Sequence, residues 1–211
     1  VCSSRTARCG GASGQDLFSF YVLFSGSGAG NTILCGGESV MCGIIGYTGE
    51  KSAIPFLIEG LRRLEYRGYD SSGVAFERDG RLHIIKAAGK LAELEKKLAA
   101  DKPVPVFSGI GHTRWATHGL PVERNAHPHV SQDGRIAIVH NGIIENFQEI
   151  KEELQARGHT FTSDTDTEVL AHLIGEERLH CPRLCEAFAR ALRRAHGTYA
   201  VVMIDADEPG V

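Results

Sequence analysis

Apolar segments with the periodicities of strands and of helices come in groups along this chain rather than in strict alternation. Strict alternation of strand and helix would indicate a doubly wound parallel sheet, whereas grouped strands and grouped helices favour an α+β fold of packed layers. The strand-like segments are residues 42–48, 72–77, 81–88, 107–117, 135–144 and 198–207. We therefore expect the α+β fold class.

The helical segments are marked by apolar spacing and by capping signals. Asn146 with Glu149, and Thr165 with Glu168, have the spacing of a capping box, in which the first and fourth residues satisfy free backbone N–H groups at a helix start. Gly158 is placed to end the first of these two helices. Helices are expected at residues 54–64, 91–98, 146–157, 169–177 and 183–196.

The composition is that of an ordinary globular protein. The chain has 211 residues, of which 42% are hydrophobic, so it can bury a sizeable core within one domain or a little more. Its 23 Lys and Arg are scattered among 26 Asp and Glu, for a net charge of −3. No basic face indicates a partner, so we expect no nucleic acid, no membrane, and small polar substrates.

The first 40 residues differ from the rest of the chain. They are rich in Gly, Ser and Cys and show no periodicity outside the apolar run at 17–24. We interpret residues 1–40 as a non-domain extension, from in-frame upstream translation or a propeptide, with Met41 as the true start; a signal peptide is the second interpretation. We expect one domain over 41–211 that lacks its C-terminal strands, because a hairpin partner should follow the strand at 198–207.

The six cysteines do not predict a disulfide framework. Three of them, Cys2, Cys9 and Cys35, lie in the first 40 residues. We therefore expect a reducing, cytoplasmic compartment. Cys181 and Cys185 lie one helical turn apart, but without a second pair they do not predict a zinc site, and we assign them no function.

Cys42 follows Met41 directly and precedes Gly43 at the start of the first predicted strand. Removal of Met41 would make Cys42 the first residue, beside a free α-amine whose pKa of about 7.7 to 8.0 lets it act as a base at neutral pH. The small cysteine permits that removal, and Gly43 leaves the thiol accessible. The alternative is a cysteine buried in a strand, which is the commonest fate of a lone cysteine and is favoured on this residue alone.

Unlike polar groups crowd the end of the strand predicted at 107–117. Arg114 can hold a carboxylate through two parallel hydrogen bonds, which suits the α-carboxylate of an amino acid. Thr117 and His118 can add donors beside it. The alternative is a surface Arg paired with an Asp or Glu. Such ion pairs contribute little to stability and do not need the other polar residues that surround Arg114, so we favour ligand binding.

Asn141 and Gly142 interrupt the apolar strand at 135–144. The side-chain amide of Asn141 and the unhindered backbone N–H of Gly142 could point at one oxygen, which is an oxyanion hole in outline. Asn-Gly is equally the dipeptide of type I′ hairpin turns, and the local sequence leaves the two alternatives even.

Asp166 stands at a predicted helix start, where the helix dipole favours a carboxylate in any case. The functional alternative pairs it with the α-ammonium group of a substrate. Together, Arg114 and Asp166 would hold an amino-acid zwitterion, a side-chain amide would meet Cys42, and Asn141 and Gly142 would stabilise the oxyanion. Glutamine fits that outline.

Four histidines, at positions 112, 118, 127 and 129, invite a metal hypothesis. Their spacing matches no common metal site, and no carboxylate or cysteine completes one. We therefore predict no metal and interpret His127 as a loop residue near the site, in a supporting role.

Five segments, in this order, resemble the class II glutamine amidotransferases, and in detail the glucosamine-6-phosphate synthase branch of that class. They are LRRLEYRGYDSSG at 61–73, HTRWATHG at 112–119, NAHPH at 125–129, HNGIIENF at 140–147 and SDTDTEV at 163–169. The amidophosphoribosyltransferase branch typically has His-Arg-Gly-Gln-Asp at 66–70 and Tyr-Ser-Thr-Ala-Gly at 115–119, which makes it a distant second.

The resemblance implies a glutaminase domain of the N-terminal nucleophile hydrolase type, a four-layer αββα sandwich, over 41–211. It implies Cys42 as nucleophile, Asn141 and Gly142 as oxyanion hole, and Arg114, Thr117, His118 and Asp166 as glutamine ligands. It further implies that Trp115 closes an ammonia channel and that Arg67 lies beside the nucleophile.

The resemblance also implies a reaction for the complete enzyme. Members of this branch pass the ammonia to fructose 6-phosphate and isomerise the product to glucosamine 6-phosphate, for UDP-N-acetylglucosamine biosynthesis, as homodimers without metal or organic cofactor. The sugar isomerase domains are absent from 41–211, so we expect this chain alone to be a glutaminase at most. Other class II amidotransferases and an inactive glutamine-binding module remain as alternatives.

Residues 1–40 depart from the family pattern. While they are attached, the α-amine of Cys42 is part of an amide and cannot act as a base. We therefore expect them to be untranslated or cleaved in the active enzyme.

Overall fold

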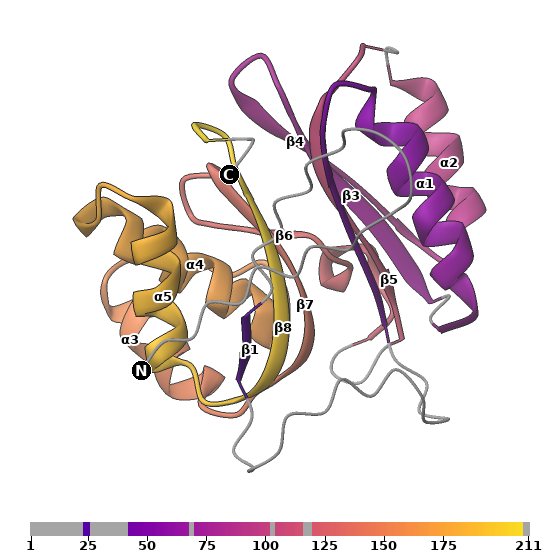
Figure 1. Cartoon of the computed structure of the whole chain (residues 1–211). Helices are drawn as coiled ribbons and strands as arrows, with labels where there is room; N and C mark the ends of the chain where they lie inside the picture. The colour runs from indigo at the N-terminus through magenta and orange to yellow at the C-terminus, as the bar shows by residue number, and fades with distance from the viewer. Residues whose placement is uncertain (1–22, 26–41, 68–69, 102–103, 116–119, 209–211) are drawn as a thin grey trace.

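The computed structural model describes residues 23–25, 42–67, 70–101, 104–115 and 120–208 (Figure 1). Two four-stranded antiparallel sheets pack face to face, and helices cover the outer face of each (Figure 1). The layers therefore run helix, sheet, sheet, helix. This order confirms the predicted α+β class and the four-layer αββα sandwich.

The first sheet has the strand order β2-β5-β3-β4. Its strands are β2 (Gly43–Thr48), β3 (Ser71–Arg78), β4 (Arg81–Ala88) and β5 (Ser108–Arg114). Its outer face is covered by α1 (Ala53–Leu64), which leads into the short 3-10 helix η1 (Glu65–Arg67), and by α2 (Leu91–Ala100). The strands predicted at 72–77 and 81–88 form the β3–β4 hairpin, which turns through Asp79 and Gly80, with φ of 56° and 72°.

The second sheet has the strand order β1-β8-β7-β6. Its strands are β1 (Leu23–Ser25), β6 (His129–Val130), β7 (Ile136–Ile144) and β8 (Gly197–Asp205), and a short 3-10 helix, η2 (Glu123–Asn125), precedes β6. Its outer face is covered by α3 (Phe147–Ala156), α4 (Asp166–His180) and α5 (Leu184–Arg194). Helix α4 is buried from Thr167 to Ile174, because it packs on β7 and lies against both α3 and α5.

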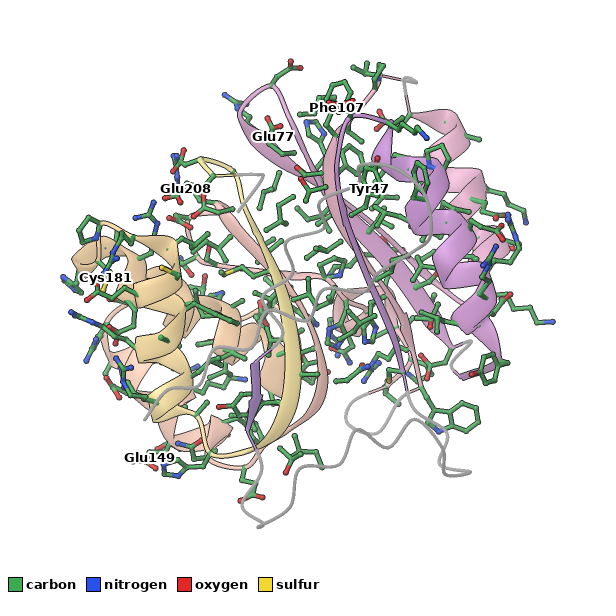
Figure 2. All side chains as sticks on the ribbon, in the orientation of Figure 1. Tyr47, Glu77, Phe107, Glu149, Cys181 and Glu208 are labelled. Atoms are coloured by element: carbon green, nitrogen blue, oxygen red, sulfur yellow. The ribbon has the colours of Figure 1, made fainter. Side chains whose placement is uncertain are left out.

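Small and β-branched side chains fill one part of the space between the two sheets (Figure 2). They are Ala75, Ile110, Ala137, Val139, Val202 and Ile204. Buried histidines occupy another part of it, and the chain approaches closely there: a Cβ on Gly73 would lie 2.2 Å from the carbonyl oxygen of His127. The interior between the sheets is therefore part apolar and part polar, and the candidate site borders the polar part.

Two local predictions differ from the structure. No regular structure was predicted before Met41, yet β1 pairs with β8, with Leu23 opposite Val201. The capping box at Asn146 is also wrong, because the Asn146 side chain donates to the carbonyl oxygen of Arg194 (2.9 Å) and accepts from the N–H of His196 (2.8 Å). Asn146 thus ties the start of α3 to the end of α5.

The helix start at Thr165 is confirmed, since Thr165 Oγ1 accepts from the backbone N–H of Glu168. The Glu168 carboxylate does not complete a capping box; it accepts hydrogen bonds from the backbone and hydroxyl groups of Thr162 and Ser163. These bonds hold the segment that leads into α4. Cys181 lies in the outer helical layer (Figure 2) and is a buried free thiol, and Cys185 in α5 is an exposed free thiol.

In the part of the chain that the structure describes, no helix is both long and apolar enough to cross a bilayer.

Candidate functional site

Cys42 lies directly before β2, at the edge of the first sheet. The antiparallel pairing of β2 with β5 places Gly43 opposite Thr113, so Cys42 faces the residues that end β5. The backbone N–H of Trp115 donates to Cys42 Sγ at 3.1 Å, and Sγ lies 3.5 Å from the Trp115 carbonyl oxygen. A Cβ on Gly43 would lie 2.6 Å from the Cβ of Leu64, so glycine lets the chain pass between α1 and β5. The thiol is therefore held in place by the backbone at the end of the neighbouring strand.

Asn141 and Gly142 lie inside β7, and the strand continues through both of them rather than turning. Asn141 Nδ2 donates to the backbone carbonyl oxygen of Cys42 at 2.8 Å. Gly142 has φ of 132°, and a Cβ there would lie 2.0 Å from the carbonyl oxygen of Thr198 on β8. Glycine is therefore required at this position. The pair approaches Cys42 from the second sheet, 99 residues further along the chain in the case of Asn141.

Arg114 and Asp166 come from different layers. Arg114 is the last residue of β5 and is buried, with 4% of its surface exposed, and its charge acts on the Cys42 thiol. Asp166 is the first residue of α4, and its carboxylate accepts from the backbone N–H of Ile144 at 2.8 Å. Because Ile144 ends β7, Asp166 is tied to the strand that carries Asn141.

Three other predicted site residues are described only in part or not at all. Thr117 and His118 lie outside the described residues, as does the side chain of Arg67, whose backbone ends η1. Trp115 has 36% of its surface exposed, and its backbone binds the Cys42 sulfur. Their roles toward glutamine and ammonia stay predictions.

His127 has a buried side chain, with 6% of its surface exposed, although it lies in the irregular segment before β6. Its ring stacks on that of His112, with 4.1 Å between the centroids, and its Nδ1 accepts from the backbone N–H of His140 at 3.3 Å. His127 therefore lies in the interior behind the site. Its backbone is in a loop, as predicted, but its side chain is buried.

The sequence suggests His112 only as a metal ligand, whereas the structure places it beside a residue of the site. Its Nε2 lies 2.8 Å from Asn141 Oδ1. His112 and Arg114 are two positions apart on β5, so both side chains face the same side of the sheet. That spacing is a signal in the sequence that could have linked His112 to the site.

The Cys42 thiol is disfavoured from ionising. Burial raises its pKa, the hydrogen bond from Trp115 N–H lowers it, and the negative charge of Asp70 raises it again, while the charge of Arg114 lowers it to a smaller extent. The net direction is upward. The group that attacks a carbonyl must be a thiolate, so this site needs a base beside Cys42.

The buried histidines are neutral at neutral pH. Burial lowers the pKa of His112 to about 4, against a hydrogen bond with Asn141 that raises it, and burial lowers the pKa values of His127 and His129 well below their usual range. Across the described residues, no three or more His, Cys, Asp or Glu side chains are arranged to hold a metal ion. His112 and His127 meet by ring stacking instead, and His118 lies outside the described part.

Comparisons with known proteins point to one family. A family model described as "Glutamine amidotransferase domain" matches residues 112–211. Among curated relatives, the glutamine–fructose-6-phosphate aminotransferase (isomerizing) of Pyrococcus horikoshii is 56% identical over 169 residues, and that of Streptomyces coelicolor is 54% identical over 172. These matches take in 80% and 81% of this chain, but the chain spans only 28% of each relative.

Two solved structures have the same fold. One is glutamine phosphoribosylpyrophosphate amidotransferase from B. subtilis in complex with ADP and GMP, with a TM-score of 0.65 and 30% identity; the match covers 77% of this chain and 35% of that one. The other is described as the allosteric regulatory enzyme of purine biosynthesis, with a TM-score of 0.67, 30% identity and the same coverage of both chains.

Proposed function

Because this chain belongs to the glutamine amidotransferase family, we propose that it hydrolyses glutamine to glutamate and ammonia with Cys42 as the nucleophile. The observation that carries the proposal is that hydrogen bonds from both sheets converge on Cys42. The Trp115 N–H reaches its sulfur from the first sheet, and the Asn141 amide reaches its carbonyl oxygen from the second. This convergence supports Cys42 as the nucleophile and Asn141 as a donor to the oxyanion.

The proposed chemistry uses the free α-amine of Cys42 as the base. This amine exists only when Cys42 is the first residue of the chain. The sulfur attacks the carboxamide carbon of glutamine, and the thiol proton passes to the α-amine. The tetrahedral oxyanion accepts hydrogen bonds from Asn141 Nδ2 and the Gly142 N–H. Its collapse expels ammonia, which takes the proton from the amine, and leaves a glutamyl thioester that water hydrolyses.

The charges around Cys42 match an amino-acid zwitterion. We assign the α-carboxylate of glutamine to Arg114, whose guanidinium is buried, and the α-ammonium group to Asp166. Thr117 and His118 add hydrogen bonds to glutamine, and Trp115 covers the path by which ammonia leaves. We assign Arg67 a role beside the nucleophile and His127 a supporting role behind the site.

For the whole protein we propose the reaction in the names of its curated relatives. Ammonia released at Cys42 passes to fructose 6-phosphate, and isomerisation yields glucosamine 6-phosphate. Residues 41–211 supply the glutaminase domain of that enzyme, without metal or organic cofactor, and the sugar chemistry lies outside them. We propose a cytoplasmic homodimer.

Two other functions can be compared with the proposed one. A phosphoribosylpyrophosphate amidotransferase fits less well, because the solved structure of that name is 30% identical whereas the aminotransferases reach 56%. An inactive glutamine-binding module would follow if residues 1–41 stay attached, since the α-amine would then be an amide.

The test compares the form of the protein that begins at Cys42 with the form that retains residues 1–41, by release of ammonia and glutamate from glutamine. Equimolar release from the first form only, abolished by Cys42→Ala, is the expected result. Calorimetric binding of glutamine without release, by protein whose N-terminal Cys42 is verified by mass spectrometry, would establish the inactive module instead.

A further inference from the structure

The orientation of the Asn141 amide is determined by its two neighbours. A backbone carbonyl oxygen only accepts hydrogen bonds, so the Asn141 atom that lies 2.8 Å from the Cys42 carbonyl oxygen is the NH₂ group. The amide oxygen must then face His112, whose Nε2 lies 2.8 Å away. The opposite orientation would place two acceptors 2.8 Å apart beside Cys42.

The tautomer of His112 follows from the orientation of the Asn141 amide. Because Asn141 Oδ1 is an acceptor, the His112 Nε2 carries the proton and donates it. The pKa of about 4 keeps the ring neutral at working pH, so this is its single N–H. Nδ1 is buried and makes no hydrogen bond of good geometry among the described residues. The backbone of His140 also raises the pKa of the ring, but by less than the contact with Asn141 does, so the Asn141 contact decides where the proton lies.

His112 is held rigidly enough to act as an anchor. It lies on β5, which is paired on both sides, with Ile44 of β2 opposite it in one direction and Gly73 of β3 in the other. Its ring is stacked on His127, at an interplanar angle of 21°, and 1% of the residue is exposed. The ring therefore cannot turn without disturbing the interior between the sheets.

We propose that His112 is a positioning residue for glutamine hydrolysis: its Nε2–H fixes the Asn141 amide so that the NH₂ group faces Cys42 and the oxyanion. This inference rests on the proposed function. One hydrogen of the Asn141 NH₂ group bonds the Cys42 carbonyl oxygen, and the second is left to meet the oxyanion. Without His112, the amide can rotate and present its oxygen to the developing negative charge.

The test is a double-mutant cycle on glutamine hydrolysis, in the form of the protein that begins at Cys42. Asn141→Ala removes an oxyanion donor and should lower kcat by about 10²- to 10³-fold. His112→Leu should lower kcat by about 10- to 100-fold, as expected for a misplaced catalytic group, with KM for glutamine changed by less than about threefold. Added to Asn141→Ala, His112→Leu should then lower kcat by no more than about twofold further.

Two matched variants separate positioning from packing. The Nε2 of a glutamine reaches the place of the histidine Nε2, so His112→Gln should stay within about fivefold of the parent kcat. His112→Asn has the same amide one methylene shorter, cannot reach Asn141, and should resemble His112→Leu. Alkylation of Cys42 by iodoacetamide forms no oxyanion, so its rate should be alike in all variants.

Multiplicative losses in the double mutant, or equal losses in His112→Gln and His112→Asn, would overturn the inference. A measurement that needs no catalysis tests the His112–Asn141 contact independently of the proposed function. The imidazole ¹⁵N chemical shifts of His112 in the parent protein should be those of the Nε2–H tautomer. An inactive parent with that tautomer would refute the proposed function but retain the anchoring of Asn141, whereas an Nδ1–H tautomer would refute the anchoring itself.

Discussion

Replacement of Gly142 by alanine tests whether the close contact with β8 determines the backbone conformation of β7 at this position. A φ of 132° is strained for any residue with a Cβ and costs of order 1–3 kcal/mol. The new Cβ would also lie 2.0 Å from the Thr198 carbonyl oxygen and 2.8 Å from the Tyr199 Cα, both of which are backbone atoms that cannot rotate away. Moving the two strands apart adds about 1–3 kcal/mol. We therefore expect the free energy of unfolding to fall by about 3 kcal/mol or more.

Gly134→Ala is the matched control for this substitution. Gly134 also has a positive φ, 72°, but no neighbouring atom lies within 4 Å of an added Cβ. It should lose about 1–2 kcal/mol through backbone strain alone and keep its kcat. Urea unfolding at constant m-value measures both losses, and kcat of Gly142→Ala should fall by about 10²- to 10³-fold because the oxyanion N–H moves. Equal stability losses in the two variants, or an unchanged kcat in Gly142→Ala, would refute the reasoning.

Three further predictions follow from the charges and burial of ionisable side chains, at the site and, for His172, in α4. Arg114→Lys should raise KM for glutamine by about tenfold or more with a smaller change in kcat, because an ammonium cannot make the two parallel bonds of a guanidinium; an unchanged KM would move the carboxylate site elsewhere. Alkylation of Cys42 by iodoacetamide, followed against pH while residues 1–41 are attached, should show a pKa above that of free cysteine, since burial disfavours the thiolate; a value below it would contradict the burial argument. The free energy of unfolding should fall as the pH drops from about 6.5 toward 4. Over this range histidines of the unfolded chain become protonated, whereas His112 and His172, with pKa values of about 4, stay neutral in the folded protein. Equal urea midpoints at pH 7 and pH 4.5 would exclude this linkage.

Local sequence was sufficient wherever one element sets its own conformation. The Asp79-Gly80 turn closed its hairpin because both residues tolerate a positive φ, and Thr165 capped α4 because its partner N–H lies three residues away. Leu57 and Leu61 of α1 are buried at the spacing that predicted their helix. In each case the deciding contact is short-range.

Local sequence failed where a distant element decides. Asn146 has the capping spacing, but α5 ends beside it and offers a carbonyl and an N–H that the side chain bonds instead. For the dipeptide at 141–142, local sequence left a strand and a hairpin turn as even alternatives. The strand holds because β8 pairs with β7 along its whole length. The spacing of His112 and Arg114 could have linked His112 to the site, but its contact with Asn141 is known only from the structure. These residues interact over 29 to 50 positions of sequence.

The site depends on the packing of the two sheets, because neither sheet contains it alone. Cys42 and Arg114 belong to the first sheet, Asn141 to the second, and the bond from Asn141 to Cys42 crosses the interface between them. That interface is lined in part by alanines 75 and 137, and a larger side chain there would separate the layers at a cost of about 1–3 kcal/mol. A separation of about 1 Å can cost 10²-fold in rate when it displaces a catalytic group. A larger side chain at this interface should therefore abolish glutamine hydrolysis while the protein still folds. Catalysis tolerates a smaller change in the distance between the sheets than folding does.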